Sequence, residues 1–160
     1  MTVRPATIDD VARIVDLVHD LAAYEREPDA VEATAADFVA VLFPPSATPT
    51  VFAHVAEVDG EVVGTAVWFV SFSTWTGRSG IWLEDLFVRP EHRGAGLGRE
   101  LLVTLARLCV ERGWSRLEWW VLDWNEPSIG FYRSLGAAAQ DEWTTYRLTG
   151  DALTALASDP

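Results

Sequence analysis

The sequence contains no lysine and only one cysteine. Its 12 basic residues are therefore all arginines, which excludes the lysine-dependent phosphate loop of P-loop nucleotide-binding proteins. Cys109 has no second cysteine for an internal disulfide, so we expect the chain in a reducing compartment, the cytoplasm. The histidines His19, His54 and His92 are scattered along the chain and predict no metal site.

Long apolar runs and an excess of positive charge are also missing. No stretch approaches the roughly 20 apolar residues of a membrane-spanning helix, and no signal peptide is recognisable, so no membrane association is expected. The 24 acidic residues give a net charge of −12, which disfavours nucleic acid as a partner and favours a cationic substrate. Solubility alone explains that charge equally well. The 49% hydrophobic content of 160 residues predicts one compact domain, residues 1–160.

The most informative stretch is Trp82–Glu111, which reads as a strand, a glycine loop and a helix. Residues 82–88 are mostly apolar on both faces, as in a buried central strand, and Pro90 ends that strand. Residues 93–98 follow as Arg-Gly-Ala-Gly-Leu-Gly. The helix then shows one apolar stripe at spacings of three and four, formed by Leu97, Leu101, Leu105, Leu108 and Cys109.

The glycine loop predicts an anion site, most simply for a pyrophosphate. Glycine lets the backbone approach a ligand closely, and the free N–H groups and positive dipole end of the helix attract negative charge. Arg93 adds a cation. The spacing does not fit the Gly-x-Gly-x-x-Gly fingerprint of dinucleotide-binding proteins. The alternative is a turn that only allows the strand and the helix to pack closely.

Periodicity and turn residues predict the remaining elements. Helices are expected at residues 7–25, 35–43, 126–135 and 151–157, and strands at residues 2–4, 50–58, 61–71, 116–122 and 143–148. Asp59-Gly60 predicts a tight hairpin between two of these strands. Residues 72–80 are expected to form a loop. This order predicts an α/β fold, with a central mixed β-sheet flanked by helices.

Three separate motifs resemble one family. The loop at residues 93–98 matches the coenzyme A loop of the GNAT acetyltransferases, Arg/Gln-x-x-Gly-x-Gly/Ala, through Arg93, Gly96 and Gly98. Residues 125–136, which begin Asn-Glu-Pro-Ser and include Phe131-Tyr132, are similar to the asparagine-and-tyrosine helix of the same enzymes. The third motif is Leu83-Glu84-Asp85. Together with Arg4-Pro5-Ala6-Thr7 and Tyr24-Glu25, these motifs resemble the diamine acetyltransferase branch over nearly the whole chain.

Within that branch, the chain resembles the thialysine Nε-acetyltransferase type more than the spermidine/spermine type. The similarity lies in Ser73-Thr74-Trp75, Gly77-Arg78 and residues 121–125. The spermidine/spermine enzymes usually carry an acidic residue at the position of Ser73. This departure counts against spermidine or spermine as the substrate.

The resemblance implies a GNAT acyl-CoA N-acyltransferase fold and a homodimer that uses acetyl-CoA and no metal. The reaction would be direct attack on the thioester by a primary amine of a small molecule, such as thialysine, a diamine or a lysine-like compound. The implied coenzyme-binding residues come from the strand, the loop and the later helix: Leu86, Phe87, Val88, Arg93, Gly94, Gly96, Leu97, Gly98, Arg99, Asn125, Ser128 and Tyr132.

The resemblance also suggests catalytic residues. Tyr132 is the candidate general acid for the departing coenzyme sulfur, and a core aromatic is the alternative. A backbone N–H within residues 86–88 could stabilise the oxyanion. Glu84 is the candidate base, acting through a water molecule, and an ion pair with an arginine is the alternative. Glu84 and Asp85 point to opposite sheet faces unless the strand is bulged there.

The implied amine pocket contains Tyr24, Glu25, Trp75, Glu84 and Asp85. Glu25 could hold a distant cationic group or simply be a solvated helix end, and Trp75 could present a cation–π face or pack against other aromatics. Other functions remain open at this point: a non-catalytic acyl-CoA-binding module and a protein or peptide N-acetyltransferase. The tryptophans Trp119, Trp120 and Trp143 could form a dimer surface or fill the core.

Overall fold

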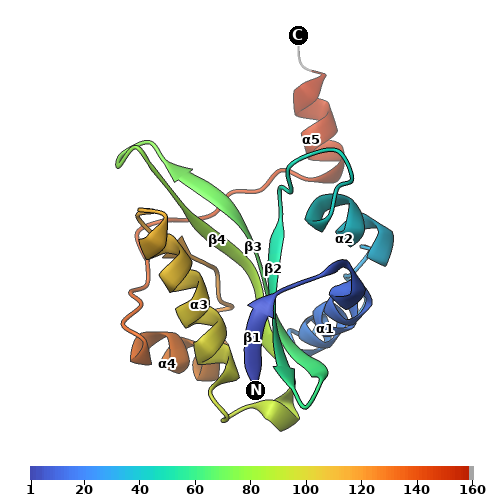
Figure 1. The fold of residues 1–160 in the computed structure, drawn as a ribbon. Coiled ribbons are helices and arrows are strands. Elements are labelled where there is room, and N and C mark those ends of the chain that lie inside the picture. Colours follow the sequence, from blue (N-terminus) through green and yellow to red (C-terminus); the bar gives the residue numbers. More distant parts are fainter. Residues whose placement is uncertain (159–160) are drawn as a thin grey trace. The chain divides into compact units, whose positions relative to one another are not determined.

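The computed structural model describes residues 1–158 of the chain (Figure 1). This described part of the chain divides into two compact units, residues 1–120 and the part that begins at residue 121. A single domain over residues 1–160 therefore stays a prediction.

The first unit is built on one mixed β-sheet of five strands, as the sequence predicts. The strands are β1 (Thr2–Pro5), β2 (Phe52–Val58), β3 (Glu61–Ser73), β4 (Arg78–Val88) and β5 (Leu117–Glu118). They lie in the order β1-β2-β3-β4-β5, and every neighbouring pair is antiparallel except the parallel pair of β4 and β5.

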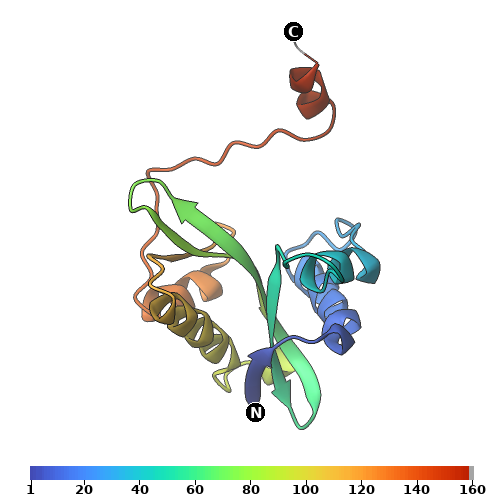
Figure 2. The same ribbon diagram turned by 45° about the horizontal axis from the view of Figure 1, so that its top comes forward.

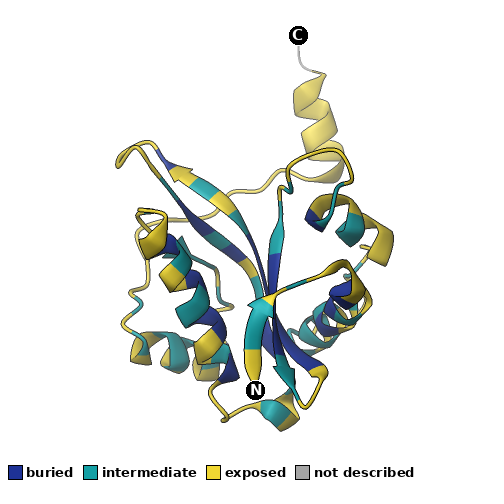
Figure 3. Ribbon diagram, viewed as in Figure 1, coloured by how far each residue is buried: buried dark blue, intermediate teal, exposed yellow. Residues whose placement is uncertain are grey.

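Helices cover both faces of this sheet (Figures 1 and 2). Helices α1 (Val11–Tyr24) and α2 (Ala35–Leu42) lie on one face, and α3 (Leu97–Glu111) lies on the other. Short 3₁₀ turns precede α1 and α3, at Ile8–Asp10 and Pro90–His92. Figure 3 shows buried residues along β3, β4 and the sheet side of α3.

Apolar periodicity explains the packing. On α3 the buried residues are Leu97, Leu101, Leu102, Leu105 and Cys109. Leu102 takes the buried place expected for Leu108, which is only half-buried. On the other face, a core forms from α1, α2 and the sheet, and its members include Ile14, Leu17, Leu42, Val55 and Phe87. Phe87 thus belongs to both the core and the predicted coenzyme strand.

The two hairpins differ in how well the sequence predicts them. Asp59 and Gly60 both have positive φ, 51° and 84°, as the tight turn between β2 and β3 requires. The loop expected at residues 72–80 is wrong in its extent, because the ladder continues to the pair Ser73 and Arg78. Only residues 74–77 form the turn. Cross-strand pairing continues there through Phe72 and Ser79 to Ser73 and Arg78.

The second unit contains helices α4 (Glu126–Ser134) and α5 (Gly150–Ala157), both close to their predicted bounds. The strand expected at residues 143–148 is wrong: these residues form no strand, and all are exposed. Thr145 and Tyr146 favour a strand, but such a preference becomes a strand only with a neighbouring ladder. The strand expected at residues 116–122 shrinks to β5, because only Leu117 and Glu118 pair with β4.

None of the helices within residues 1–158 is long and apolar enough to cross a membrane. The same residues contain no cluster of three or more His, Cys, Asp or Glu side chains able to hold a metal ion.

Candidate functional site

The glycine loop has the backbone geometry of an anion site. Gly94 and Gly96 have φ of 82° and 85°, and a Cβ atom at either position would meet nothing within 4 Å. Glycine is therefore required by the backbone conformation, and the space beside it is open. The first hydrogen bond of α3 runs from the Glu100 N–H to the Gly96 carbonyl at 2.9 Å. The N–H groups of Leu97, Gly98 and Arg99 come before that bond, so no carbonyl of the helix itself accepts from them. Such N–H groups at a helix start can bind an anion.

Arg93 has a second role that the sequence does not reveal. Its Nε–H donates to the Val88 carbonyl at 2.9 Å. Its guanidinium carbon lies 4.8 Å from the ring centre of Tyr24 and 5.3 Å from that of Phe87. The arginine that begins the loop is thus fixed to the end of β4 and to the last residue of α1. No local pattern marks the contact with Tyr24, because it joins the loop to the end of α1, which is distant in the sequence.

Strand β4 has a partly unpaired edge beside the loop. On one side it pairs with β3 as far as Val88, and on the other side only Ile81 and Trp82 pair with β5. Within residues 1–120, the segment Leu86–Val88 therefore keeps an edge that no strand covers. An extended ligand with amide groups can pair with such an edge as a further strand would.

A β-bulge rearranges the two acidic residues of β4. Leu83 lies opposite Trp68 and Asp85 lies opposite Val67, so Glu84 has no opposite residue. The sequence allowed Glu84 and Asp85 a shared role only if the strand is bulged there, and this condition is confirmed. Bulges commonly redirect side chains next to functional sites.

The carboxyl of Asp85 is the most perturbed acid of this region. Burial, and then the nearby charges of Glu84 and Glu25, raise its pKa from 3.8 to about 6. Burial also raises the pKa of Glu25, which follows the last residue of α1. Within residues 1–158, Asp85 makes no hydrogen bond or ion pair with another side chain. A partly buried carboxyl of this kind favours a cation or a proton beside it.

Glu84 differs from its neighbour. It is exposed, and its Oε2 accepts a hydrogen bond from the Trp82 indole N–H at 3.0 Å. It makes no ion pair with an arginine within the described chain, so the structural alternative considered for it is wrong. Glu84 is preferred to Asp85 as the candidate base only because of the family resemblance. The raised pKa of Asp85 depends on neighbours that only the fold brings close.

Tyr24 and Trp75, the other predicted amine-pocket residues, lie in different surroundings. Tyr24 lines a shallow hollow of about 400 Å³ together with Asp20, Ala23, Phe87, Arg89, Pro90 and Glu91. Two of these lining residues, Arg89 and Asp20, form an ion pair at 3.1 Å. Trp75 lies in the turn between β3 and β4 and is 88% exposed. A role for Trp75 in the pocket stays a prediction.

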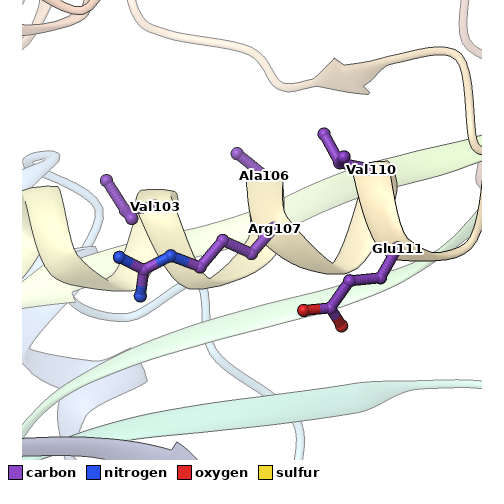
Figure 4. A pocket seen from close by; sticks show the side chains of 5 residues that line it. All are labelled: Val103, Ala106, Arg107, Val110 and Glu111. Atoms are coloured by element: carbon purple, nitrogen blue, oxygen red, sulfur yellow. The ribbon is translucent and has the colours of Figure 1, made fainter.

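A second hollow, of about 330 Å³, lies on the outer face of α3 (Figure 4). Val103, Ala106 and Val110 supply its apolar lining, with Arg107 and Glu111 beside them. Arg107 forms a 3.6 Å ion pair with Glu100. None of the predicted site residues lines this hollow, so we do not place the site here.

Three predicted coenzyme residues belong to the second unit. Asn125 is buried and caps α4: its Oδ1 accepts the Ser128 N–H at 3.3 Å. Tyr132 lies on the same helix and is half-buried, with its ring centre 5.3 Å from that of Phe131. This cap is a finding of the structure, whereas contact of Asn125 with the coenzyme and the catalytic role of Tyr132 stay predictions.

Comparison with known proteins shows the family of the chain. The model of the "Acetyltransferase (GNAT) family" matches residues 14–137. The chain is 36% identical to the thialysine N-epsilon-acetyltransferase of Bos taurus, over 97% of this chain and 96% of that protein. It is 29% identical to the L-ornithine N5-acetyltransferase of Arabidopsis thaliana, over 96% and 86% of the two chains. Among solved structures, an integron cassette protein of V. cholerae superposes with a TM-score of 0.81 at 26% identity, covering 99% and 98% of the chains.

Proposed function

Because the chain belongs to the GNAT acetyltransferase family, we propose that it transfers the acetyl group of acetyl-CoA to a primary amine of a small cationic molecule. It is an N-acetyltransferase. Thialysine, ornithine, diamines and lysine-like compounds are the candidate acceptors, since two of its relatives are named for thialysine and ornithine. The carboxyl of Asp85, half-buried, without a cationic partner and close to Glu25, is the observation that carries this proposal.

The coenzyme is assigned to the loop and the open edge of β4. The pantetheine arm would pair with the backbone of residues 86–88, and the pyrophosphate would meet Arg93 and the backbone of residues 94–99. Asn125, Ser128 and Tyr132 would contact the coenzyme from α4. The family match crosses from one unit into the other, which supports one acetyltransferase domain made of both. No step of the proposed reaction requires a metal ion.

The amine is assigned to the acidic side of β4. A cationic amine beside Asp85 and Glu25 would stabilise their ionised forms. This attraction would offset the free-energy cost of burying the two carboxylates. Tyr24 and Trp75 would present aromatic faces to the same cation. This arrangement favours an acceptor with a second positive charge, beyond the amine that reacts.

The chemistry begins with an uncharged amine. Glu84, exposed beside Asp85, would take the ammonium proton through a water molecule. The nitrogen then attacks the thioester carbon, and a backbone N–H within residues 86–88 stabilises the oxyanion. The carbon–sulfur bond breaks as Tyr132 gives its proton to the sulfur, and the nitrogen loses its extra proton, which restores the phenol of Tyr132. The products are the N-acetyl amine and coenzyme A.

An acceptor screen tests the function. Release of coenzyme A is measured with thialysine, L-ornithine, a diamine, lysine and a short peptide, for the wild type, Asp85→Asn and a control. Asp59→Asn is the matched control, because it removes one carboxylate from an exposed turn whose φ of 51° asparagine tolerates. We expect the KM of a dicationic acceptor to rise roughly 10- to 100-fold in Asp85→Asn only, as for the loss of a charged hydrogen bond. An unchanged KM would remove Asp85 from the amine site, and absence of turnover with every acceptor would favour a non-catalytic coenzyme-binding module.

We also propose a homodimer, in the cytoplasm. All residues from 138 to 158 are exposed, including Tyr146 at 93%, Leu153 at 53% and Leu156 at 58%. A helix of eight residues such as α5 is marginal in water by itself, so a partner surface would stabilise it. Trp120 and Trp143 are also exposed, at 58% and 71%, which favours a dimer surface over a core role.

Light scattering at micromolar concentration tests the dimer. We expect twice the chain mass for the wild type and the monomer mass for the double variant Leu153→Ser, Leu156→Ser. Val110→Ser, which removes an exposed side chain from α3, serves as the control and should remain a dimer. A monomeric wild type would refute the proposal, and a dimeric double variant would place the contact elsewhere.

A further inference from the structure

Arg93 connects two places that the proposed function assigns to different substrates. It is the first residue of the glycine loop, where the pyrophosphate of the coenzyme is proposed to bind. Its guanidinium stacks on Tyr24, the last residue of α1, and its Nε–H holds the Val88 carbonyl at the end of β4. The same guanidinium also lies over the ring of Phe87, which is fixed in the core.

The helix end that Arg93 contacts leads directly into the acidic side of the site. Tyr24 is followed by Glu25, whose charge acts on the carboxyl of Asp85. The chain then turns at Arg26, which adopts a φ of 69° that residues with a side chain rarely take. This turn is closed by hydrogen bonds from the N–H groups of Glu25 and Glu27 to the carbonyls of Leu21 and Ala22, at 2.8 and 2.9 Å.

We propose that Arg93 is a positioning residue that couples coenzyme binding in the glycine loop to the order of the last turn of α1 on the amine side. This inference rests on the proposed assignment of the coenzyme to the loop and of the amine to Tyr24 and Glu25. When the pyrophosphate immobilises the loop, Arg93 is held over Tyr24, and the turn that carries Glu25 opens less often. Coenzyme and amine therefore strengthen each other's binding, because such coupling is reciprocal.

The contact itself sets the size of the effect. A cation–π contact at a partly exposed site corresponds to about a two- to five-fold change in an equilibrium constant. We therefore expect coenzyme A to slow the exchange of the Glu25 and Glu27 amides by about two- to five-fold. The amide hydrogens are suitable reporters because both close the turn after α1 and neither belongs to the loop.

The experiment measures hydrogen exchange of residues 21–27 with and without saturating coenzyme A, and the coenzyme affinity by calorimetry. Arg93→Met removes the charge and keeps a flexible apolar side chain. Arg112→Met is the matched control, because Arg112 also lies over an aromatic ring, that of Trp114 at 4.9 Å, at the opposite end of α3. We expect protection by coenzyme in the wild type and in Arg112→Met, and no protection in Arg93→Met.

A second variant keeps the loop intact. Tyr24→Leu removes the ring that Arg93 contacts, so it should bind coenzyme A normally, lose the protection of the turn, and lose the two- to five-fold gain in thialysine affinity that coenzyme A confers on the wild type. If Arg93→Met no longer binds coenzyme A, that variant cannot test the coupling, and Tyr24→Leu provides the test instead. Equal protection in Tyr24→Leu and wild type would overturn the coupling, as would a wild type that binds coenzyme without protecting the turn. A wild type that binds no coenzyme would instead refute the proposed function.

Discussion

Replacing Asp85 by asparagine should stabilise the free protein at neutral pH. A rise of the Asp85 pKa from 3.8 to about 6 means that folding disfavours the ionised carboxylate, by roughly 3 kcal/mol when the group is fully ionised in both states. The cause is burial first, followed by repulsion from Glu84 and Glu25. Asparagine carries no charge, so the variant loses this penalty.

The sign of the pH dependence follows from proton binding. Between the unfolded pKa of 3.8 and the folded pKa of about 6, the folded state binds more protons at Asp85, so rising pH lowers the stability. The penalty is complete above pH 6 to 7 and absent below about pH 4. The variant should therefore gain up to about 3 kcal/mol over the wild type at pH 7.5, and little at pH 4.

Urea unfolding at several pH values, for wild type and Asp85→Asn, measures this difference directly. Taking the difference between the two proteins cancels the titration of other groups, such as Asp10. Asp59→Asn again serves as the control and should show no such trend. A variant that is less stable than the wild type at neutral pH, or equally stabilised at both pH extremes, would refute the assignment. Higher stability together with a higher amine KM would mark Asp85 as a residue kept for function at a cost in stability.

Three further predictions concern the loop, the general acid and the start of α1. Gly96→Val should lower the affinity for coenzyme A at least tenfold, as measured by calorimetry. Gly113→Val is strained in the same way, at a φ of 65°, and should lower only the free energy of unfolding, by about 1–2 kcal/mol, as measured by urea unfolding. Tyr132→Phe should lower kcat roughly 100-fold with little change in the KM of acetyl-CoA, and full kcat under conditions where chemistry limits turnover would remove Tyr132 from the mechanism. The Arg4 guanidinium lowers the pKa of Asp10 from 3.8 to about 2, so stability should fall between about pH 4 and pH 2 by roughly 2 kcal/mol, a loss absent from Asp10→Asn.

The sequence by itself determined the strand, the glycine loop and the helix at residues 82–111. Each depends on local chemistry: Pro90 stops a strand, Gly96 takes a φ of 85° at the start of α3, and leucines at helical spacing face the sheet. Asp59-Gly60 specified its hairpin for the same reason. These signals act within a few residues, so they can be recognised before any tertiary contact is known. The resemblance to the acetyltransferases depended on the same local motifs.

Only the tertiary structure decided which acid is perturbed and what Arg93 contacts. The bulge at Glu84 arises from pairing with β3, and the pKa of Asp85 is raised partly by Glu25, a residue 60 positions away in the sequence. Residues 143–148 favour a strand by composition, yet they form none, because a strand exists only where a neighbour completes its ladder. Local conformation follows from side chains and adjacent backbone, whereas charge environment and strand pairing depend on segments that only the fold brings together.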